Sequence, residues 1–485
     1  MKITPIIGLE VHIELQTKSK MFCGCSANHF RVEPNTHTCP VCLGLPGALP
    51  VPNQTACEYC VKLGLALGCS INQESFFERK NYFYPDLAKS YQITQLQKPF
   101  AINGKITVDG HDIRINRAHM EEDTGKSVHQ NIDGVDSTLL DYNRSGVPLI
   151  EIVSEPDIES PQMAKDYLLK IQQIVRYIGV SDADIEKGSM RCEPTVNLKI
   201  EEDGKTFYTP LVEIKNVASL TGVLNAIQFE IVRQTDAFME TREVKTSASG
   251  GNKTTRGWDA VKNKTFLQRE KEGSADYRYF PEPDIPPIIF TDEEITKIRE
   301  SLPELPEQKF ARYQTDFGLN SYDSNLLTQD TNFSQCFEKA ISLNPTKDMA
   351  KFVANLFLGA IKTYLNESLE EISIEKINSQ FFKNLFDSVS KSEISSTVAK
   401  QVIIESYQTN QDPVEIAKLK GLIQVSDSGE IEKIAKVVIT QNQKAVQDYK
   451  KNPASIGFLI GQLMKASKGS ANPQLAKEIL EKLLK

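Results

Sequence analysis

Acidic and histidine side chains alternate along the first predicted strand of the chain, in a spacing that could bind a divalent cation. Over residues 7–15, apolar and polar residues alternate with the period of two that is typical of a half-buried strand. Because residues two apart in a strand share a side, Glu10, His12 and Glu14 lie on one face. Such a face is more often simply solvated, so metal binding requires further acids from elsewhere in the chain.

Two later segments supply such acids. Residues 119–126 contain three consecutive acids, Glu121, Glu122 and Asp123, and end in a glycine turn. Glu151 is a single carboxylate inside a strongly apolar run, where burial would be costly unless a cation compensated it. Acids from separate segments can converge on Mg²⁺, the usual partner of ATP phosphates, although the histidine would also suit Mn²⁺ or Zn²⁺.

Cations interleaved with aromatic residues could neutralise phosphate and stack on a base. Residues 79–86 carry Arg79, Lys80 and Tyr82 in such an arrangement, although the same string could form the edge of a core with capping charges. The sequence has no P-loop, dinucleotide fingerprint or kinase loop, and residues 250–254 resemble a P-loop only in composition. If ATP binds, it therefore binds in an unusual nucleotide site.

A cysteine array is the strongest single local motif. It consists of two close pairs separated by a short loop: Cys23, Cys25, Cys39 and Cys42. Four thiolates in this spacing favour a closed structural Zn²⁺ site over redox chemistry, with His29 and His37 as possible substitute ligands. Cys57 and Cys60 fall on a helix-like run, where we expect them to be small buried hydrophobes.

The elements that position these residues change character along the chain. Asp109-Gly110, Asp133-Gly134 and Asp203-Gly204 lie near alternating segments and predict hairpin turns, because both residue types tolerate a positive φ. Residues 160–179 predict a helix that begins at Ser160 and ends at a glycine. Antiparallel strands with segregated helices make this N-terminal region α+β.

A proline-rich joint at residues 281–287 precedes a helical region. Thr291 and Glu294 form a capping box, and residues 349–365 keep one apolar helical face for several turns. We expect little strand structure after this joint and a second boundary near residues 406–413. The predicted domains are a β-rich domain, a helical domain and a small helical tail: 1–290, 291–408 and 409–485.

Charge is distributed unevenly, and no segment indicates a membrane. The net charge is −8, yet residues 431–485 carry ten lysines and four acidic residues, a balance of +6. That asymmetry favours a basic arm for a polyanion, with a solvated helical bundle as the alternative. No apolar run reaches the roughly 18 to 20 residues of a membrane span. Without a signal-peptide core, we expect the chain to be cytoplasmic, or to lie in an organelle after removal of a presequence.

Together these segments closely resemble the B subunit of the aspartyl/glutamyl-tRNA amidotransferases (GatB). The resemblance spans nearly the whole chain and depends on long strings: residues 7–12, 79–86, 119–123, 148–157, 188–192, 213–216, 276–284, 457–465 and 471–473. It implies a cradle-like N-terminal domain with the kinase and transamidase site, a helical domain, and a tail domain that binds tRNA. Residues 241–255 depart from the family pattern, so no function is assigned to them.

The resemblance also implies an activity and its partners. Family members phosphorylate the side-chain carboxylate of misacylated Glu-tRNA(Gln) or Asp-tRNA(Asn) with ATP, and ammonia then displaces the phosphate. Ammonia comes through a channel from a glutaminase A subunit, and a small C subunit completes the heterotrimer.

By position in the family motifs, four residues would hold Mg²⁺: Glu10, His12, Glu122 and Glu151. Lys80 and Lys89 would lie near the nucleotide or the channel, and Arg79 and Tyr82 would join Lys80 in nucleotide binding. The zinc knuckle occurs in only some members, and this chain carries all four thiols.

Two other classes of protein remain open on the residues alone. One is a non-catalytic scaffold that binds zinc and tRNA, and the other is an ATP-dependent ligase for a small carboxylic acid. The apolar setting of Glu151 and the Glu10–His12 face favour catalysis over a scaffold. The basic tail favours tRNA over a small molecule as the substrate.

Overall fold

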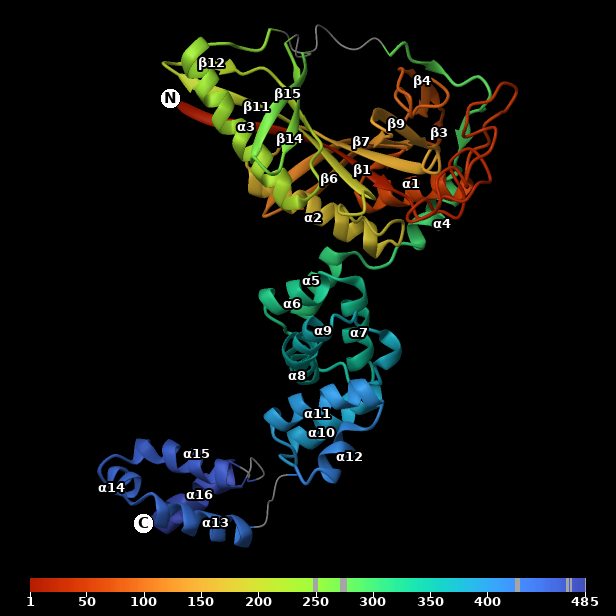
Figure 1. Cartoon of the computed structure of the whole chain (residues 1–485). Coiled ribbons are helices and arrows are strands. Elements are labelled where there is room, and N and C mark those ends of the chain that lie inside the picture. The colour runs from red at the N-terminus through yellow and green to blue at the C-terminus, as the bar shows by residue number, and fades with distance from the viewer. Residues whose placement is uncertain (247–251, 271–276, 424–427, 468–470, 472, 485) are drawn as a thin grey trace. The chain divides into compact units, whose positions relative to one another are not determined.

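The chain folds into two compact units, which a computed structural model describes for residues 1–246, 252–270, 277–423, 428–467, 471 and 473–484 (Figure 1). The first unit is Met1–Leu305 and the second is Pro306–Lys485. The first combines a large sheet with helices, and the second is helical. This arrangement confirms the predicted α+β fold with a helical C-terminal part.

A 13-stranded sheet forms the first unit, and its main path runs β15-β14-β13-β11-β1-β10-β7-β5-β4-β16. β12, β2 and β6 attach beside this path, whereas β17-β3 and β8-β9 form separate two-stranded sheets. The pairings are antiparallel except that β13 and β14 run parallel. The strands are β1 (Lys2–Glu14), β2 (Ser70–Ile71), β3 (Glu74–Ser75), β4 (Glu78–Asn81), β5 (Tyr91–Thr94), β6 (Ala101–Val108), β7 (His111–Glu122), β8 (Lys126–Ile132), β9 (Val135–Asp141), β10 (Pro148–Ser154), β11 (Met190–Glu202), β12 (Lys205–Tyr208), β13 (Val212–Lys215), β14 (Thr254–Asp259), β15 (Lys264–Glu270), β16 (Phe280–Pro281) and β17 (Ile288–Ile289).

The central strand β1 shows the alternation that its sequence predicts. Ile7, Leu9, Val11 and Ile13 are at most 1% exposed and belong to the main core. The residues between them point to the opposite face, because successive side chains in a strand alternate. The sheet therefore has one apolar face and one face that can carry polar groups.

Helices cover the apolar face. They are α1 (Gln54–Ala66), α2 (Pro161–Tyr177), α3 (Leu220–Thr241) and α4 (Asp292–Glu300). α2 and α3 pack against each other along one side of the curved sheet (Figure 1). The predicted start of α2 is confirmed, because the Ser160 side chain accepts a hydrogen bond from the Met163 backbone N–H. With this face covered, the polar face of the sheet is available for a site.

The three Asp-Gly pairs form the predicted hairpin turns. Asp109-Gly110 joins β6 to β7, Asp133-Gly134 joins β8 to β9, and Asp203-Gly204 joins β11 to β12. Both residues of each pair have a positive φ, as tight two-residue hairpins require.

The helix α4 extends the first unit beyond the proline-rich joint. It begins with the predicted capping box of Thr291 and Glu294. Its Ile295 lies in the same core as the sheet, and α4 packs on α1. The first unit consequently ends at Leu305 and includes the segment after residue 290, whereas the division of the chain into three domains stays a prediction.

The second unit consists of helices, and no strand is present among its described residues. A π-helical segment, Leu356–Ile361, lies between α8 and α9, within the apolar run that predicted one helix. The helices are α5 (Pro306–Thr315), α6 (Ser321–Thr328), α7 (Thr331–Ile341), α8 (Lys347–Asn355), α9 (Lys362–Ser368), α10 (Ser379–Ser390), α11 (Ser396–Thr409), α12 (Pro413–Leu419), α13 (Ser428–Gln441), α14 (Gln443–Lys451), α15 (Ile456–Ala466) and α16 (Pro473–Leu484).

The second unit contains two separate hydrophobic clusters. The first extends from Tyr313 to Ala417 and includes α12 through Ile416, and the second extends from Ile431 to Leu484. α12 therefore belongs with the preceding helices, although the sequence placed it in the tail domain. No helix in the described part of the chain has the length and apolar character to cross a membrane.

The segment at residues 250–254, which resembles a P-loop only in composition, is partly described. Residues 247–251, including the two glycines that resemble a P-loop, lie outside the described residues. Thr254 and Thr255 are not in a loop, because they begin β14 and pair in parallel with β13.

Candidate active site and metal centres

The polar face of the sheet holds a cavity of about 520 Å³, here called the polar cleft. Side chains from β1, β4, β5, β7, β10, β11 and β13 line it. Carboxylates, two imidazoles, lysines and arginines line it, and the part contributed by β1, β7 and β10 is here called its floor. A cleft of this size and polarity suits a highly charged ligand.

Three side chains on the floor form a compact ligand set. One ligand atom each from His12, Glu121 and Glu151 lies within 4.8 Å of the other two. His12 Nε2 is 3.5 Å from Glu121 Oε2 and 3.4 Å from Glu151 Oε2. His119 Nε2 adds a second imidazole, 3.5 Å from an oxygen of each carboxylate. Glu121 and Glu151 are buried, so this negative charge has little solvent to stabilise it.

Strand register brings these residues together. His12 on β1 is directly opposite Glu151 on β10, and Glu151 is directly opposite His119 on β7. Glu121 lies two residues after His119 and therefore shares its face. The polar alternation was predicted for β1 but not for β7, although His119 and Glu121 show the same spacing as Glu10 and His12.

Mutual stabilisation fixes the charges of this set. Burial lowers the pKa of His12, but hydrogen bonds to Glu121 and Glu151 outweigh burial and raise it well above its usual range. Burial raises the pKa of Glu121, yet His119 and His12 hold it well below its usual range. Two ionised carboxylates thus share a buried space with cationic groups. A divalent cation with oxygen and nitrogen ligands, such as Mg²⁺ or Mn²⁺, fits this donor set when it replaces the proton on His12, because a histidine ligand must be neutral.

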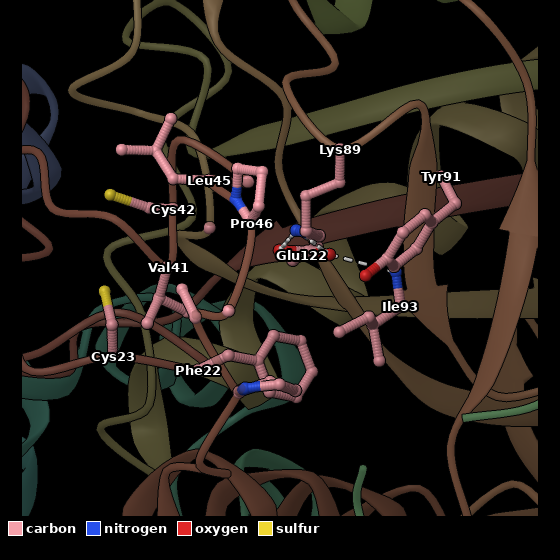
Figure 2. Close-up of a pocket in the computed structure, with 15 residues that line it drawn as sticks. Phe22, Cys23, Val41, Cys42, Leu45, Pro46, Lys89, Tyr91, Ile93 and Glu122 are labelled. Atoms are coloured by element: carbon pink, nitrogen blue, oxygen red, sulfur yellow. Dashed lines mark hydrogen bonds and ion pairs between the residues drawn. The ribbon is translucent and has the colours of Figure 1, made fainter. Parts of the chain in front are cut away.

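The structure does not bring Glu122 to this set. Its carboxylate accepts a hydrogen bond from the Ile93 backbone N–H at 2.9 Å and lies 2.6 Å from Lys89 Nζ. Both side chains line a second cavity of about 220 Å³, here called the Lys89 pocket, whose wall includes Cys23 and Cys42 (Figure 2). The reason is strand alternation, since adjacent residues on β7 face opposite sides and Glu121 takes the place expected of Glu122.

Glu10 lies in the polar cleft but outside the compact ligand set. It is directly opposite Glu193 on β11, and burial followed by the charge of Glu151 raises its pKa. Nearby, Lys215 Nζ is 2.5 Å from Glu193 and 3.1 Å from Glu213. No chemical role was predicted for Glu193, Glu213 or Lys215 from the sequence. Glu213 and Lys215 are nevertheless two residues apart, the spacing that places side chains on one face of a strand.

Of the three residues predicted to bind the nucleotide, Lys80 and Tyr82 line the polar cleft, and Arg79 does not. Burial lowers the pKa of Lys80, but the negative charge of Glu121 and, after it, those of its other neighbours together have the larger effect. The pKa of Lys80 is therefore raised. Arg79 is one residue away on β4 and faces the other side, where it donates to Glu282 at 2.6 and 2.9 Å. Arg79 is therefore held in an ion pair within the fold.

The four array cysteines meet at one point. One Sγ atom from each of Cys23, Cys25, Cys39 and Cys42 lies within 4.8 Å of the other three. A hydrogen bond from the Cys23 thiol lowers the pKa of Cys42 to about 4, so one thiolate is already favoured. Four converging sulfurs fit tetrahedral Zn²⁺.

Neither histidine considered as a substitute ligand is needed in this cluster. His29 Nε2 is 2.9 Å from Glu14 Oε1, and His37 Nδ1 is 2.7 Å from the Asn28 carbonyl oxygen. Cys57 and Cys60 are buried on α1, which confirms them as core residues.

The comparisons with known families agree with this geometry. A family model described as the GatB/GatE catalytic domain matches residues 5–296, and one described as the GatB domain matches residues 335–484. A relative from Persephonella marina, by name the B subunit of an aspartyl/glutamyl-tRNA(Asn/Gln) amidotransferase, is 46% identical over 493 residues and both chains are fully covered. Relatives of the same name from Thermotoga petrophila and a Thermoanaerobacter species are 42% and 45% identical. Both alignments include the whole of this chain, and they include 99% and 100% of the two relatives.

The matching family models and relatives identify this chain, with its carboxylate and imidazole cleft, as an enzyme subunit of the ligase class. The chain belongs to the GatB family of amidotransferase B subunits.

Proposed function

We propose that this chain activates the side-chain carboxylate of glutamate or aspartate attached to tRNA(Gln) or tRNA(Asn). The observation that carries the proposal is the His12, Glu121 and Glu151 ligand set on the floor of a 520 Å³ polar cleft, with Lys80 beside it. A carboxylate is a poor acyl donor because its leaving group would be oxide. Phosphorylation by ATP makes the leaving group phosphate, which ammonia can then displace to form the amide.

The residues of the polar cleft suit this chemistry because phosphoryl transfer depends mainly on positioning and charge neutralisation. His12, Glu121 and Glu151 would hold Mg²⁺, which supplies positive charge to the phosphates of ATP when bound. Lys80 remains protonated beside them and can bind a phosphate oxygen, and Tyr82 lines the same wall. Glu10 lines the same cleft, where the charge of Glu151 acts on it.

Ammonia is proposed to come from a glutaminase A subunit, with a small C subunit completing a heterotrimer. The thiols of this chain support the need for a partner. Burial raises the pKa of Cys57 to about 12 and that of Cys60 well above its usual range, so neither is a suitable nucleophile for glutamine hydrolysis. Lys89 and Glu122 in the Lys89 pocket are candidates to line the route of ammonia.

The cysteine cluster and the C-terminal segment have supporting roles in this proposal. Zn²⁺ bound by the four cysteines would hold the loop that forms one wall of the Lys89 pocket. Residues 431–485, with ten lysines, would bind the phosphates of tRNA. The proposal keeps a helical domain followed by a tail domain for tRNA, but it moves α4 to the first unit and α12 to the helical domain, so the tail begins after α12.

Reconstitution tests the proposal directly. The chain is combined with the A and C subunits, ATP, glutamine and either Glu-tRNA(Gln) or Asp-tRNA(Asn), and amide formation and ATP hydrolysis are measured. We expect ATP hydrolysis that depends on a misacylated tRNA, and amide product from at least one of the two substrates. If amide forms at the same rate without ATP, the assignment of carboxylate activation to this chain is wrong.

A further inference from the structure

Arg191 lies in the polar cleft next to the ligand set. It is directly opposite His12 across β1 and β11, and its side chain lines the polar cleft. The side chain is 35% exposed, whereas most of the charged groups on the floor are buried. Its guanidinium is thus accessible from the cleft and close to the residues proposed to bind Mg²⁺.

Hydrogen bonds to Gly188 and Asp123 fix the position of this guanidinium. Its Nε donates to the Gly188 carbonyl oxygen at 3.2 Å, and its two terminal nitrogens donate to the two oxygens of Asp123. Asp123 is 5% exposed, and Arg144 Nε lies 3.3 Å from it on the other side. Arg144 also donates to the Thr124 and Gly125 carbonyl oxygens, so it is committed to the backbone.

The charges of Asp123 and its two arginine partners sum to one positive charge beside the cleft. Two guanidiniums share this one carboxylate. The other acids near Arg191 are matched elsewhere, since Glu14 contacts His29 and Glu193 contacts Lys215. The negative charge of Asp123 is the largest cause of the raised pKa of Arg191, so the guanidinium stays charged.

Hydrogen-bonding capacity also remains at this position. A guanidinium has five N–H donors. Three donors of Arg191 have the acceptors described above, and within the described residues no acceptor is recorded for the other two. A group that is rigidly held, charged and incompletely hydrogen-bonded is suited to bind an anion in a fixed place.

We propose that Arg191 is a catalytic residue that binds the γ-phosphoryl group of ATP while it moves to the substrate carboxylate. In that step an oxygen of the substrate carboxylate bonds to the γ-phosphorus, and the bond from that phosphorus to the bridging oxygen of ADP breaks. Arg191 donates to the equatorial oxygens of the phosphoryl group, on which charge is distributed in the transition state. This inference rests on the proposed function and adds to it a residue that the family motifs did not assign.

The test uses the reconstituted complex and measures ATP turnover that depends on misacylated tRNA. We expect Arg191→Met to lower the kcat of this turnover by about 10³-fold, the lower end of what a phosphoryl-binding arginine contributes. The KM for tRNA should stay unchanged, and Arg191→Lys should retain part of the turnover because it keeps the charge. Arg114→Met is the matched control, because Arg114 also forms a two-pronged ion pair with a carboxylate, Asp157, but does not line the polar cleft.

A second variant separates catalysis from folding. Free guanidinium added to Arg191→Gly should restore part of the ATP turnover, and it should have no effect on Arg114→Gly. Wild-type turnover by folded Arg191→Met would overturn the inference, as would a loss that appears only in the KM for tRNA or a lack of rescue in Arg191→Gly. Absence of tRNA-dependent ATP turnover in the wild-type complex would instead overturn the proposed function itself.

Discussion

His12 Nε2 lies 3.4 Å from Glu151 Oε2, and the two residues are direct partners across β1 and β10. A single pairing between neighbouring strands therefore sets the distance between an imidazole and a buried carboxylate. Because antiparallel pairing fixes this distance through the backbone, the ligand set does not depend on any loop. Such a site is already organised before its ligands arrive.

The first prediction concerns the ligand set. Glu121→Gln and Glu151→Gln each keep the shape of the side chain but remove a charge that would neutralise Mg²⁺. We expect each to lower amide formation by at least ~10²-fold, as when a charge at a phosphoryl-transfer centre is removed. Glutamine hydrolysis by the A subunit should decrease less.

Glu74→Gln serves as the control for this prediction, because Glu74 is exposed and pairs with Lys98 outside the cleft. Amide formation by the control should equal that of the wild type. Near-normal amide formation by Glu151→Gln would remove this residue from the ligand set.

The second prediction concerns zinc. Elemental analysis of the purified chain should find about one zinc per molecule, because four converging thiols make a complete tetrahedral site. Cys39→Ser should lose this zinc, and the loop around the cluster should become sensitive to protease, since metal binding and local folding are coupled. Cys336→Ala should keep the metal, because Cys336 is buried in the second unit. A metal-free wild-type chain with an intact loop would contradict the assignment.

The third prediction concerns an ion pair in the second unit. Glu338 accepts hydrogen bonds from Lys309 and Tyr313 at 3.0 Å each, and it also pairs with Arg312. Burial raises the pKa of Glu338, but the hydrogen bond from Lys309 and its charge outweigh burial, so the pKa is lowered overall. At neutral pH, Glu338→Gln should lower the free energy of unfolding of this region by about 1.5 to 3 kcal/mol, the range for hydrogen bonds to charged groups.

The pH dependence of that effect has a defined sign. A carboxyl with a lowered pKa in the folded state stabilises the fold above its unfolded pKa and loses this effect as the pH falls through the folded value. The difference between wild type and Glu338→Gln should thus be complete above the ordinary pKa of 4.5 and decrease below it. Urea titration followed by hydrogen exchange in α5 and α7 measures it. A difference that stays constant down to pH 2 would rule out this ion pair as its cause.

The fourth prediction concerns tRNA binding by the C-terminal segment. The test is a truncation that removes the residues after Ile423. This position keeps α12, which packs into the first helical cluster and whose Asp412 accepts a hydrogen bond from Asn384 Nδ2 at 2.6 Å. Loss of ten lysines should raise the KM for tRNA and reduce the salt dependence of binding, because fewer phosphates are neutralised. Binding measured across a salt series decides the question, with ATP binding as the control for an intact first unit. Equal affinity and equal salt dependence would show that the segment does not bind tRNA.

Local patterns in the sequence predicted the elements that depend on backbone preference alone. The alternation in β1, the start of α2 at Ser160, the capping box at Thr291 and the three Asp-Gly turns are all observed. Each of these depends on residues within a few positions of one another, so one stretch of sequence is sufficient.

The composition of the site could be predicted less completely, because it depends on which strands are neighbours. Three consecutive acids at the end of β7 looked like one cluster, yet Glu121, Glu122 and Asp123 contact different partners. Arg191, Glu193 and Glu213 reach the cleft only because β11 pairs with β1 and β13 pairs with β11 in the sheet. That order is set by long-range pairing, which local periodicity does not encode.

Two neighbouring carboxylates on β7 line two different cavities. Glu121 lines the polar cleft, and Glu122 lines the Lys89 pocket. The loss or gain of a single codon upstream of them in this strand would exchange their sides and so damage both cavities at once. A substitution in β7 keeps this alternation, whereas a change in length between the bulge opposite Val153 and Ser154 and these two carboxylates reverses it. We therefore expect this strand to be among the parts of the gene least able to accept insertions or deletions, whereas the exposed β8–β9 hairpin that follows can vary in length without disturbing either cavity.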